Sequence, residues 1–223
     1  MGRYDLACFD MDGTLTRVRS SWQWVHECFG VDSEPNYRAF VNGEIDELEF
    51  MRRDIGLWTS KNPEVTISDI ARTFRDMPLV DGIQETVACL HDNGIACVIV
   101  SGGIDLAAEM LKNEFGFDGF VADGIGTNPD GTLTGEGIQN IDLRDKGAHV
   151  KRLIGDYRTE AARTVSIGNS YTDIPMFEAS GTSVAVNPAD PWTRDAATFW
   201  VETDNIADIL DFIVGDGAET SES

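Results

Sequence analysis

Short apolar runs alternate with helical stretches along most of the chain, and this alternation constrains the fold more than any other feature. The run at residues 95–100 is continuous, as is typical of a central parallel strand covered on both faces. Further strands are expected at residues 6–9, 164–167, 183–186 and 198–201. Helical spacing of apolar residues marks 83–91, 106–115, 144–154, 174–179 and 206–213. The pattern predicts an α/β fold built on a doubly wound parallel sheet.

Residues 16–76 break this alternation. They contain four helical stretches, at 21–29, 37–41, 47–57 and 67–74, and their aromatic residues can supply a small core. We therefore expect a Rossmann-like core domain formed by residues 1–15 and 77–214, with residues 16–76 inserted after the first strand as a small helical cap. The cap is either a lid over the site or a set of decorative helices, and its position favours the lid. A turn at 128–131 predicts an added β-hairpin, and the acidic end, 215–223, is expected to be disordered.

The charge of the chain limits its partners. The formal net charge is −22, and the acids are spread along the whole sequence while only four lysines occur. Nucleic acid is not expected as a partner, because phosphate backbones are bound by Lys and Arg. Dispersed acid with scarce lysine is typical of a halophile-like protein that stays soluble in concentrated salt. No apolar run approaches the roughly 20 residues of a membrane span, so a cytoplasmic protein is expected. Nothing in the sequence indicates an oligomeric state.

Two carboxylates follow the first predicted strand. Asp10 and Asp12 lie in the segment Asp-Met-Asp-Gly-Thr, where Gly13 turns the chain. Open α/β sheets bind ligands in the crevice at the carboxyl ends of their strands. Paired acids there suit a divalent cation, or a nucleophile beside a proton donor. The alternative interpretation is an Asx-type turn after an edge strand.

Three further polar segments fall at predicted strand ends or helix starts. Ser101-Gly102-Gly103 follows residues 95–100 and exposes backbone N–H groups that suit a phosphate, unless Ser101 is only a helix cap. Lys146 opposes the dipole of the helix that it begins, a departure that often marks function, although a solvated lysine is the commoner case and stays the alternative. Asn169 and Asp173 follow residues 164–167 and carry oxygens that suit Mg²⁺, although capping is the alternative. Four such clusters together favour a site.

In order and spacing, these motifs resemble the four motifs of the haloacid dehalogenase superfamily of phosphohydrolases. The resemblance runs from residue 4 to about residue 213, and the helical insert resembles the cap of the phosphoserine phosphatase branch. It implies a Mg²⁺-dependent phosphatase in which Asp10 attacks phosphorus and Asp12 protonates the leaving oxygen, then activates water. It also implies that Asp10, Asp12, Asn169 and Asp173 form the metal site, with Asp173 acting through water or Lys146. The phosphoryl oxygens would be held by four residues: Ser101, Gly102, Lys146 and Thr172.

The chain departs from that branch at two places. Asn169 stands where relatives usually carry Asp, which removes one charge from the metal site. The cap residues that recognise the substrate's ammonium and carboxylate in the family fall, by an ungapped count, near Arg19 and Asp54, with their charges exchanged. Arg52 and Arg53 lie close by, and a small shift in register would restore an arginine.

Three functions remain open from the sequence. The first is a phosphoserine phosphatase-like enzyme of serine biosynthesis. The second is a phosphatase for another small phosphate ester, of a sugar or a carboxylic acid. The third is a non-catalytic domain that binds a phosphate ligand through a weakened metal site. His26, His91 and His149 are expected to have no convergent partners, and Trp22 and Trp24 to belong to the cap core.

Overall fold

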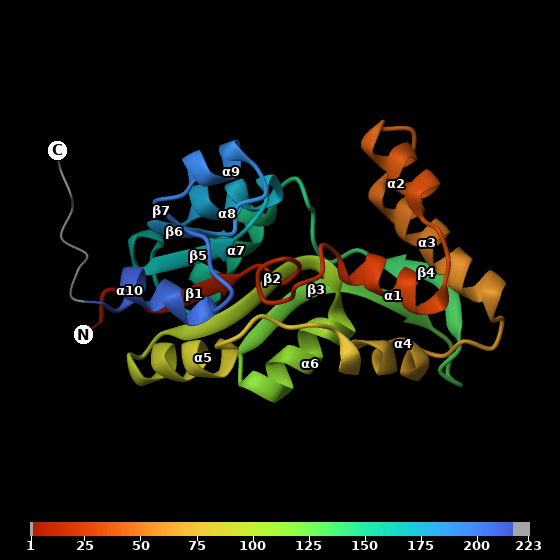
Figure 1. Cartoon of the computed structure of the whole chain (residues 1–223), viewed down its shortest axis with the longest axis horizontal. Coiled ribbons are helices and arrows are strands. Elements are labelled where there is room, and N and C mark those ends of the chain that lie inside the picture. The colour runs from red at the N-terminus through yellow and green to blue at the C-terminus, as the bar shows by residue number, and fades with distance from the viewer. Residues whose placement is uncertain (1, 216–223) are drawn as a thin grey trace.

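The computed structural model describes residues 2–215; the predicted acidic tail therefore lies almost wholly outside the described residues. A seven-stranded sheet with the order β4-β3-β2-β1-β5-β6-β7 forms its centre (Figure 1). The strands are β1 (Leu6–Phe9), β2 (Ala96–Ile104), β3 (Gly119–Thr127), β4 (Leu133–Ile138), β5 (Thr164–Gly168), β6 (Thr182–Val186) and β7 (Phe199–Val201). Every pairing is parallel except β3 with β4. The predicted doubly wound α/β sheet is confirmed.

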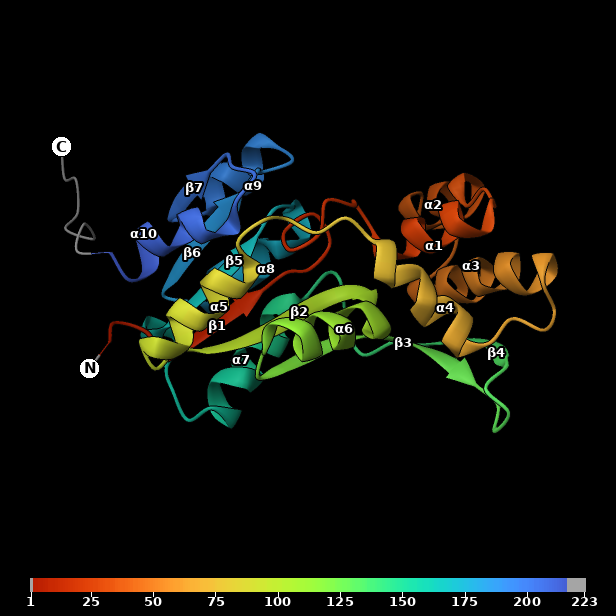
Figure 2. The same ribbon diagram turned by 60° about the horizontal axis from the view of Figure 1, so that its bottom comes forward.

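The order of the strands reverses at β1, which pairs with β2 on one side and β5 on the other. Side chains alternate along β1: Ala7 and Phe9 join the larger of two apolar clusters, and Leu6 and Cys8 join the smaller. Helices α5 (Ile83–Asp92) and α6 (Asp105–Phe115) cover one face (Figure 2). Helices α7 (Lys146–Asp156) and α8 (Ile174–Ala179) supply the smaller cluster on the other face. The crevice at the carboxyl end of β1 therefore lies at a topological switch point.

The insert is helical, as predicted, and forms the second lobe of the molecule, seen at the right of Figure 1. Its helices are α1 (Ser21–Phe29), α2 (Glu34–Val41), α3 (Glu47–Lys61) and α4 (Ile67–Thr73), followed by the short 3₁₀ helix η1 (Phe74–Asp76). Its two linkers run side by side, because Val80 N donates to Leu15 O at 3.1 Å and Arg17 N donates to Pro78 O at 2.8 Å.

The predicted hairpin is present, but it packs against the cap. Strand β4 lies against α3, so closely that a Cβ on Gly137 would be 2.6 Å from Met51 Cβ. Ile67 N also donates to Gly131 O at 2.9 Å, which links α4 to the hairpin turn. Cap and hairpin together therefore form the lobe that faces the core domain across the strand ends.

Strand β2 is longer than the apolar run predicts. It continues through Ser101, Gly102 and Gly103 to Ile104, and α6 begins only at Asp105. The alternative interpretation, in which Ser101 only caps a helix, is therefore wrong, and the N–H groups of Gly102 and Gly103 belong to the strand and not to the start of α6. The glycines are needed because neighbouring segments approach the strand closely: a Cβ on Gly102 would lie 2.3 Å from Leu143 Cδ2.

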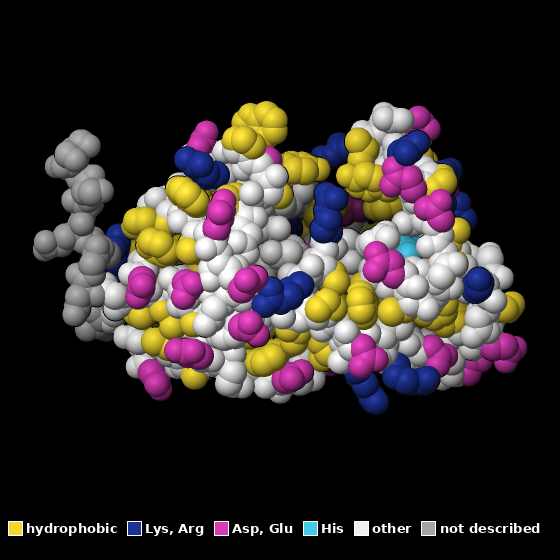
Figure 3. Space-filling model, in the orientation of Figure 1, with side chains coloured by type: hydrophobic (Ala, Val, Ile, Leu, Met, Phe, Trp, Pro, Cys, Tyr) yellow, Lys and Arg dark blue, Asp and Glu magenta, His cyan; other side chains and the backbone are white. Residues whose placement is uncertain are grey.

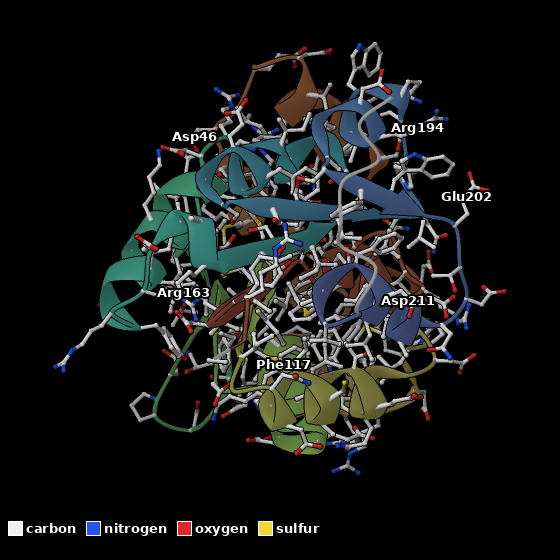
Figure 4. All side chains as sticks on the ribbon, turned by 90° about the vertical axis from the view of Figure 1, so that its left-hand side faces the viewer. Asp46, Phe117, Arg163, Arg194, Glu202 and Asp211 are labelled. Carbon is white, nitrogen blue, oxygen red and sulfur yellow. The ribbon has the colours of Figure 1, made fainter. Side chains whose placement is uncertain are left out.

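Acidic side chains are scattered over the face shown in Figure 3, which also shows a hollow between the two lobes. At the opposite end from the cap, the exposed residues Arg194, Glu202 and Asp211 lie on the outside while Phe117 lies in the interior (Figure 4). Cys8 and Cys97 are buried free thiols. Each helix in the described part of the chain is too short or too polar to cross a membrane. The remaining elements are α9 (Pro191–Ala196), α10 (Leu210–Ile213) and three short 3₁₀ helices: η2 (Ala161–Arg163), η3 (Tyr171–Asp173) and η4 (Ile206–Ile209).

Candidate active site

A cavity of about 580 Å³ lies between the core domain and the cap. The core contributes Asp10, Asp12 and Lys146, together with the end of β2 and the loop after β5. The cap contributes side chains from α1, α2 and α3. The strand ends predicted from the sequence therefore do meet in one place, because parallel strands end at the same edge of the sheet.

Lys146 joins two of the predicted carboxylates. Its Nζ donates to Asp10 Oδ1 and to Asp173 Oδ1, both at 2.7 Å, although the side chains belong to α7, the segment after β1 and η3. The exposed fraction of all three side chains is at most 5%. The alternative interpretation of Lys146 as a solvated surface residue is therefore wrong. A lysine at the first position of α7 is tolerated because two carboxylates outweigh the helix dipole.

One ammonium shared by two carboxylates leaves the buried group short of positive charge. Burial raises the pKa of Asp10 to about 7, the nearby Asp173 carboxylate acts in the same direction, and Lys146 opposes both. Burial by itself lowers the pKa of Lys146, but Asp10 and Asp173 outweigh it, so the net shift is upward and the lysine stays charged. The site is thus built to accept further positive charge next to Asp10.

Asp12 is held from one side only. Its Oδ2 accepts hydrogen bonds from Ser21 N and Ser21 Oγ, both at 2.9 Å. Its Oδ1 is buried and has no hydrogen-bond partner among the described residues. Burial raises the pKa of Asp12 to about 6, although the two bonds from Ser21 lower it. A carboxyl group with a raised pKa and one oxygen unused is suited to transfer protons near neutral pH.

The end of β2 forms one wall of the cavity. Ser101 is 1% exposed, and its Oγ accepts a hydrogen bond from Gly103 N at 3.1 Å, so its own hydrogen can donate to an oxygen in the cavity. The carbonyl of Gly102 accepts from Trp22 Nε1 at 3.1 Å, which fixes the strand end against α1. Both predicted phosphate-binding residues of this segment line the cavity.

The loop after β5 brings Asn169 to the first motif. Thr14 Oγ1 lies 3.4 Å from Asp10 Oδ2 and 3.5 Å from Asn169 Oδ1, and a Cβ on Gly13 would lie 2.3 Å from Asn169 Nδ2. The Asp10 carboxylate and the Asn169 amide therefore face the same small region beside the turn at Gly13. Oxygen donors of this kind fit a hard divalent cation such as Mg²⁺. No cluster of three or more His, Cys, Asp or Glu side chains suited to a metal is found among the described residues.

Both carboxylate oxygens of Asp173 already accept hydrogen bonds. Its Oδ1 is taken by Lys146, and its Oδ2 accepts from the backbone N–H groups of Asn169 and Ser170, both at 3.0 Å. The capping role weighed from the sequence is thus present together with the contact to Lys146. Thr172 lines the cavity, and its Oγ1 lies 2.8 Å from Ser170 Oγ.

The predicted cap residues divide into two groups. Arg19 and Asp54 line the cavity. Arg52 and Arg53 instead lie on the exposed side of α3, where each forms an ion pair with Glu49 at 2.7 Å, and they are not part of the cavity wall. The structure therefore does not place an arginine from α3 in the cavity.

Asp54 is 2% exposed and belongs to a buried hydrogen-bond network. Trp58 Nε1 donates to His26 Nδ1 at 2.8 Å, so the other ring nitrogen, Nε2, carries the hydrogen that reaches Asp54 Oδ2 at 3.0 Å. Asn36 Nδ2 donates to Asp54 Oδ1 at 2.8 Å. The expectation that His26 has no convergent partner is wrong, and so is that for His91, which lies 2.9 Å from Asp118 Oδ2.

Several residues of the cavity were missed by sequence reasoning. Trp22 was expected in the cap core and does stack on Trp58, with centroids 5.6 Å apart, but it also lines the cavity. Asp54 was named as a cap residue from the sequence, and helical spacing in α3 agrees with its buried position, because it lies three and four residues from Met51 and Trp58. Ser21 gave no signal beyond that of an ordinary helix start.

The chain matches the model of the haloacid dehalogenase-like hydrolase family over residues 7–178 and therefore belongs to that family. It is an enzyme of the phosphatase type, similar to phosphoserine phosphatases. The phosphoserine phosphatase of Halobacterium salinarum is 30% identical over 197 residues, which cover 82% of this chain and 86% of the relative. That of Idiomarina loihiensis is 27% identical over 215 residues, covering 92% and 91%. A substrate-bound phosphoserine phosphatase structure superposes with a TM-score of 0.80 at 22% identity, covering 96% of this chain and 100% of that one.

Proposed function

We propose that this protein hydrolyses a small phosphate monoester through an aspartyl-phosphate on Asp10, with Mg²⁺ as its cofactor and phosphoserine as the first candidate substrate. The observation that carries the proposal is the buried group of Asp10, Lys146 and Asp173 at the switch point of the sheet, with Asp12 beside it on the wall of the same cavity. A binding module has no need of a second acid with an unused oxygen, so the same observation argues against a non-catalytic phosphate-binding domain.

The chemistry follows from what each residue can do. Asp10 attacks phosphorus and the bond to the leaving oxygen breaks, while the carboxyl group of Asp12 gives its proton to that oxygen and an alcohol departs. Asp12 then takes a proton from water, whose oxygen attacks phosphorus and releases Asp10 and inorganic phosphate. Lys146, Ser101, Gly102 and Thr172 would hold the phosphoryl oxygens throughout.

For the metal, the residues that fit are the Asp10 carboxylate, the Asp12 backbone carbonyl and the Asn169 amide oxygen. Asp173 would support them from outside by holding Lys146 and the backbone of Asn169. When bound, Mg²⁺ supplies positive charge that lets a carboxylate approach a phosphate dianion. Asn169 contributes no charge, so a weaker affinity than that of a site with an aspartate is expected.

The cap wall supports a leaving group that carries a carboxylate. Arg19 lies on the wall of the cavity, and Glu27 and Glu34 lie on the same wall and can meet an ammonium. Serine carries both charges, and the relatives named above are phosphoserine phosphatases. If phosphoserine is the substrate, the product is serine and the enzyme acts in serine biosynthesis. The alternative is another small ester, such as a sugar phosphate or the phosphate of a carboxylic acid.

The proposal is tested by phosphate release from phosphoserine, a phosphoglycerate and a hexose phosphate, with and without Mg²⁺. The Asp10→Asn variant serves as the control, because it keeps the shape of the side chain and removes the nucleophile. Turnover that needs both Mg²⁺ and Asp10 is expected, with phosphoserine the best ester. Absence of turnover on every ester by a folded protein would favour the binding module.

We also propose that the protein works in a salt-rich cytoplasm. The support is the excess of acids, 39 Asp and Glu against 17 Lys and Arg, spread along the chain. Salt screens the repulsion among exposed carboxylates, so the free energy of unfolding and the turnover are both expected to rise from low to molar KCl. Stability that is unchanged or falls with KCl would contradict this.

A further inference from the structure

Ser21 connects the cap to the core at the site of proton transfer. It is fully buried at the first position of α1, and its N–H and O–H both donate to Asp12 Oδ2 at 2.9 Å. Its Oγ also accepts a hydrogen bond from the backbone N–H of Ile104, the last residue of β2, at 2.9 Å. A hydroxyl group has one hydrogen, so these contacts fix its direction: from Ile104 N–H to Ser21, and from Ser21 to Asp12.

The close packing around Ser21 also fixes the position of its hydroxyl group. A Cβ on Gly103 would lie 2.5 Å from Ser21 Oγ and 2.6 Å from Asp12 Oδ2. Only glycine therefore lets β2 come near enough for the hydroxyl to reach both Asp12 and Ile104. The next residue, Trp22, donates to Gly102 O at 3.1 Å, so two hydrogen bonds that flank Gly103 hold the start of α1 on the strand.

We propose that Ser21 is a positioning residue for Asp12, which fixes Oδ2 so that Oδ1 is the oxygen that exchanges a proton with the leaving group. An oxygen that already accepts two hydrogen bonds is a poor place for a proton. The other oxygen is buried and has no partner among the described residues, and Asp12 lines the cavity. This inference rests on the proposed function, in which Asp12 is the general acid.

The arrangement also makes proton transfer depend on the seating of α1. Both donors to Oδ2 belong to the first residue of that helix, so a movement of α1 away from β2 would remove them together. The cap thus contributes to the phosphoryl-transfer site directly, in addition to any contact with the substrate.

The test compares two esters that differ in their need for a proton. An alkyl phosphate such as phosphoserine has a poor leaving group that must be protonated, whereas p-nitrophenyl phosphate releases a stable phenolate. The quantity measured is kcat/KM for each ester, which reports the steps up to departure of the leaving group. The variants are Ser21→Ala, Ser21→Thr and, as a matched control, Ser20→Ala.

Ser21→Ala is expected to lower kcat/KM for the alkyl ester about tenfold more than for the aryl ester, a fraction of the roughly 10²–10⁴ that a general acid provides. Ser21→Thr keeps the hydroxyl and is expected to restore the ratio between the two esters. Ser20→Ala removes the N-cap of α1, whose hydroxyl accepts from Gln23 N at 3.4 Å, and is expected to change stability without changing that ratio.

Two outcomes would overturn the inference. An equal loss on both esters in Ser21→Ala would mean that the serine is only structural, and a changed ratio in Ser20→Ala would mean that any damage to α1 suffices. Asp12→Asn separates the inference from the proposed function. If Asp12→Asn loses more kcat/KM on the alkyl ester than on the aryl ester and Ser21→Ala does not, the inference about Ser21 fails and the proposed function stands. If Asp12→Asn shows no difference, the role of Asp12 in the proposed function fails.

Discussion

The two ends of the cavity are built in different ways. At the core end, the side chains of Asp10, Lys146 and Asp173 come from separate elements that meet at one edge of the sheet, where Lys146 bonds to both acids. At the cap end, the charged groups are placed by which face of a helix they occupy, as with Asp54 on the inner face of α3 and Arg53 on its outer face. The difference implies that the core end sets the reaction and the cap end selects the ester.

The largest effect is expected from Lys146→Met, which removes the ammonium group that bonds to Asp10 and Asp173 at the core end of the cavity. The change leaves two carboxylates buried without a cation, so the free energy of unfolding should fall by about 3–5 kcal/mol and turnover should be lost. Chemical denaturation and phosphate release measure the two effects.

Lys151→Met is the matched control, because it removes an exposed lysine from the same helix. A second variant, Lys146→Met with Asp173→Asn, should regain part of the stability because it removes one of the two uncompensated carboxylates. Equal stability of Lys146→Met and Lys151→Met would show that the buried ion pairs do not hold the core end together.

A smaller effect at the same end is expected from Asn169→Asp. A second carboxylate beside Asp10 should lower the Mg²⁺ concentration for half-maximal activity by about tenfold. Asn128→Asp adds the same charge in the hairpin turn and should leave that concentration unchanged. An unchanged Mg²⁺ requirement in Asn169→Asp would mean that residue 169 does not contact the metal.

The cap end is tested by comparing three arginines. Arg19→Ala should raise KM for a carboxylate-bearing ester about fivefold, because it removes a cation from the cavity wall. Arg52→Ala and Arg53→Ala should leave KM unchanged, because their side chains pair with Glu49 on the outside of α3. A larger effect of Arg52 or Arg53 than of Arg19 would reverse the assignment of the cap faces.

The smallest effect concerns Glu47, where the cap meets the core and Gln139 Nε2 donates to Glu47 Oε2 at 2.8 Å. Burial, aided by Asp123 and Asp142, raises the pKa of Glu47 from 4.5 to about 7. The folded state therefore binds a proton on the Glu47 carboxyl group more tightly than the unfolded state does. The stability that this protonation contributes is lost as pH rises from about 4.5 through 7.

Glu47→Gln should thus gain stability relative to the wild type between pH 5 and pH 8, by about 1 kcal/mol once partial exposure is allowed for. Glu49→Gln is the control without a trend in this range: hydrogen bonds from Arg53 and Arg52 hold the pKa of Glu49 below its usual value, so its contribution to stability is already complete at pH 5 and stays constant up to pH 8. Thermal denaturation at the two pH values measures both variants, and the same trend in both would refute the assignment.

The contrast between the two ends also explains what the sequence could predict. Asp10 and Asp173 could be found because parallel strands must end at one edge, whatever the details of packing, and Lys146 because a lysine that begins a helix opposes the helix dipole. The sheet, the helical insert and the hairpin followed from periodicity and turn residues in the same way.

Other features depend on contacts that no local pattern encodes. The extension of β2 through Gly103 depends on how closely Ser21 and Leu143 approach the strand. The partners of His26 come from α3, about thirty residues further along the chain, so its network could not be predicted from its own helix. Residues 52–54 are consecutive in α3, where each step turns the side chain by about 100°, so a small error in register exchanges inside and outside.

Trapping the phosphorylated intermediate would show whether Asp10 is the nucleophile. The protein is mixed with phosphoserine and Mg²⁺, quenched with acid at a series of times, and digested for peptide mass measurement. If Asp10 is the nucleophile, the peptide that contains it gains the mass of one phosphoryl group in the wild type and not in Asp10→Asn. Release of phosphate with no phosphoryl group on that peptide at any time, or with one on another residue, would contradict this role of Asp10.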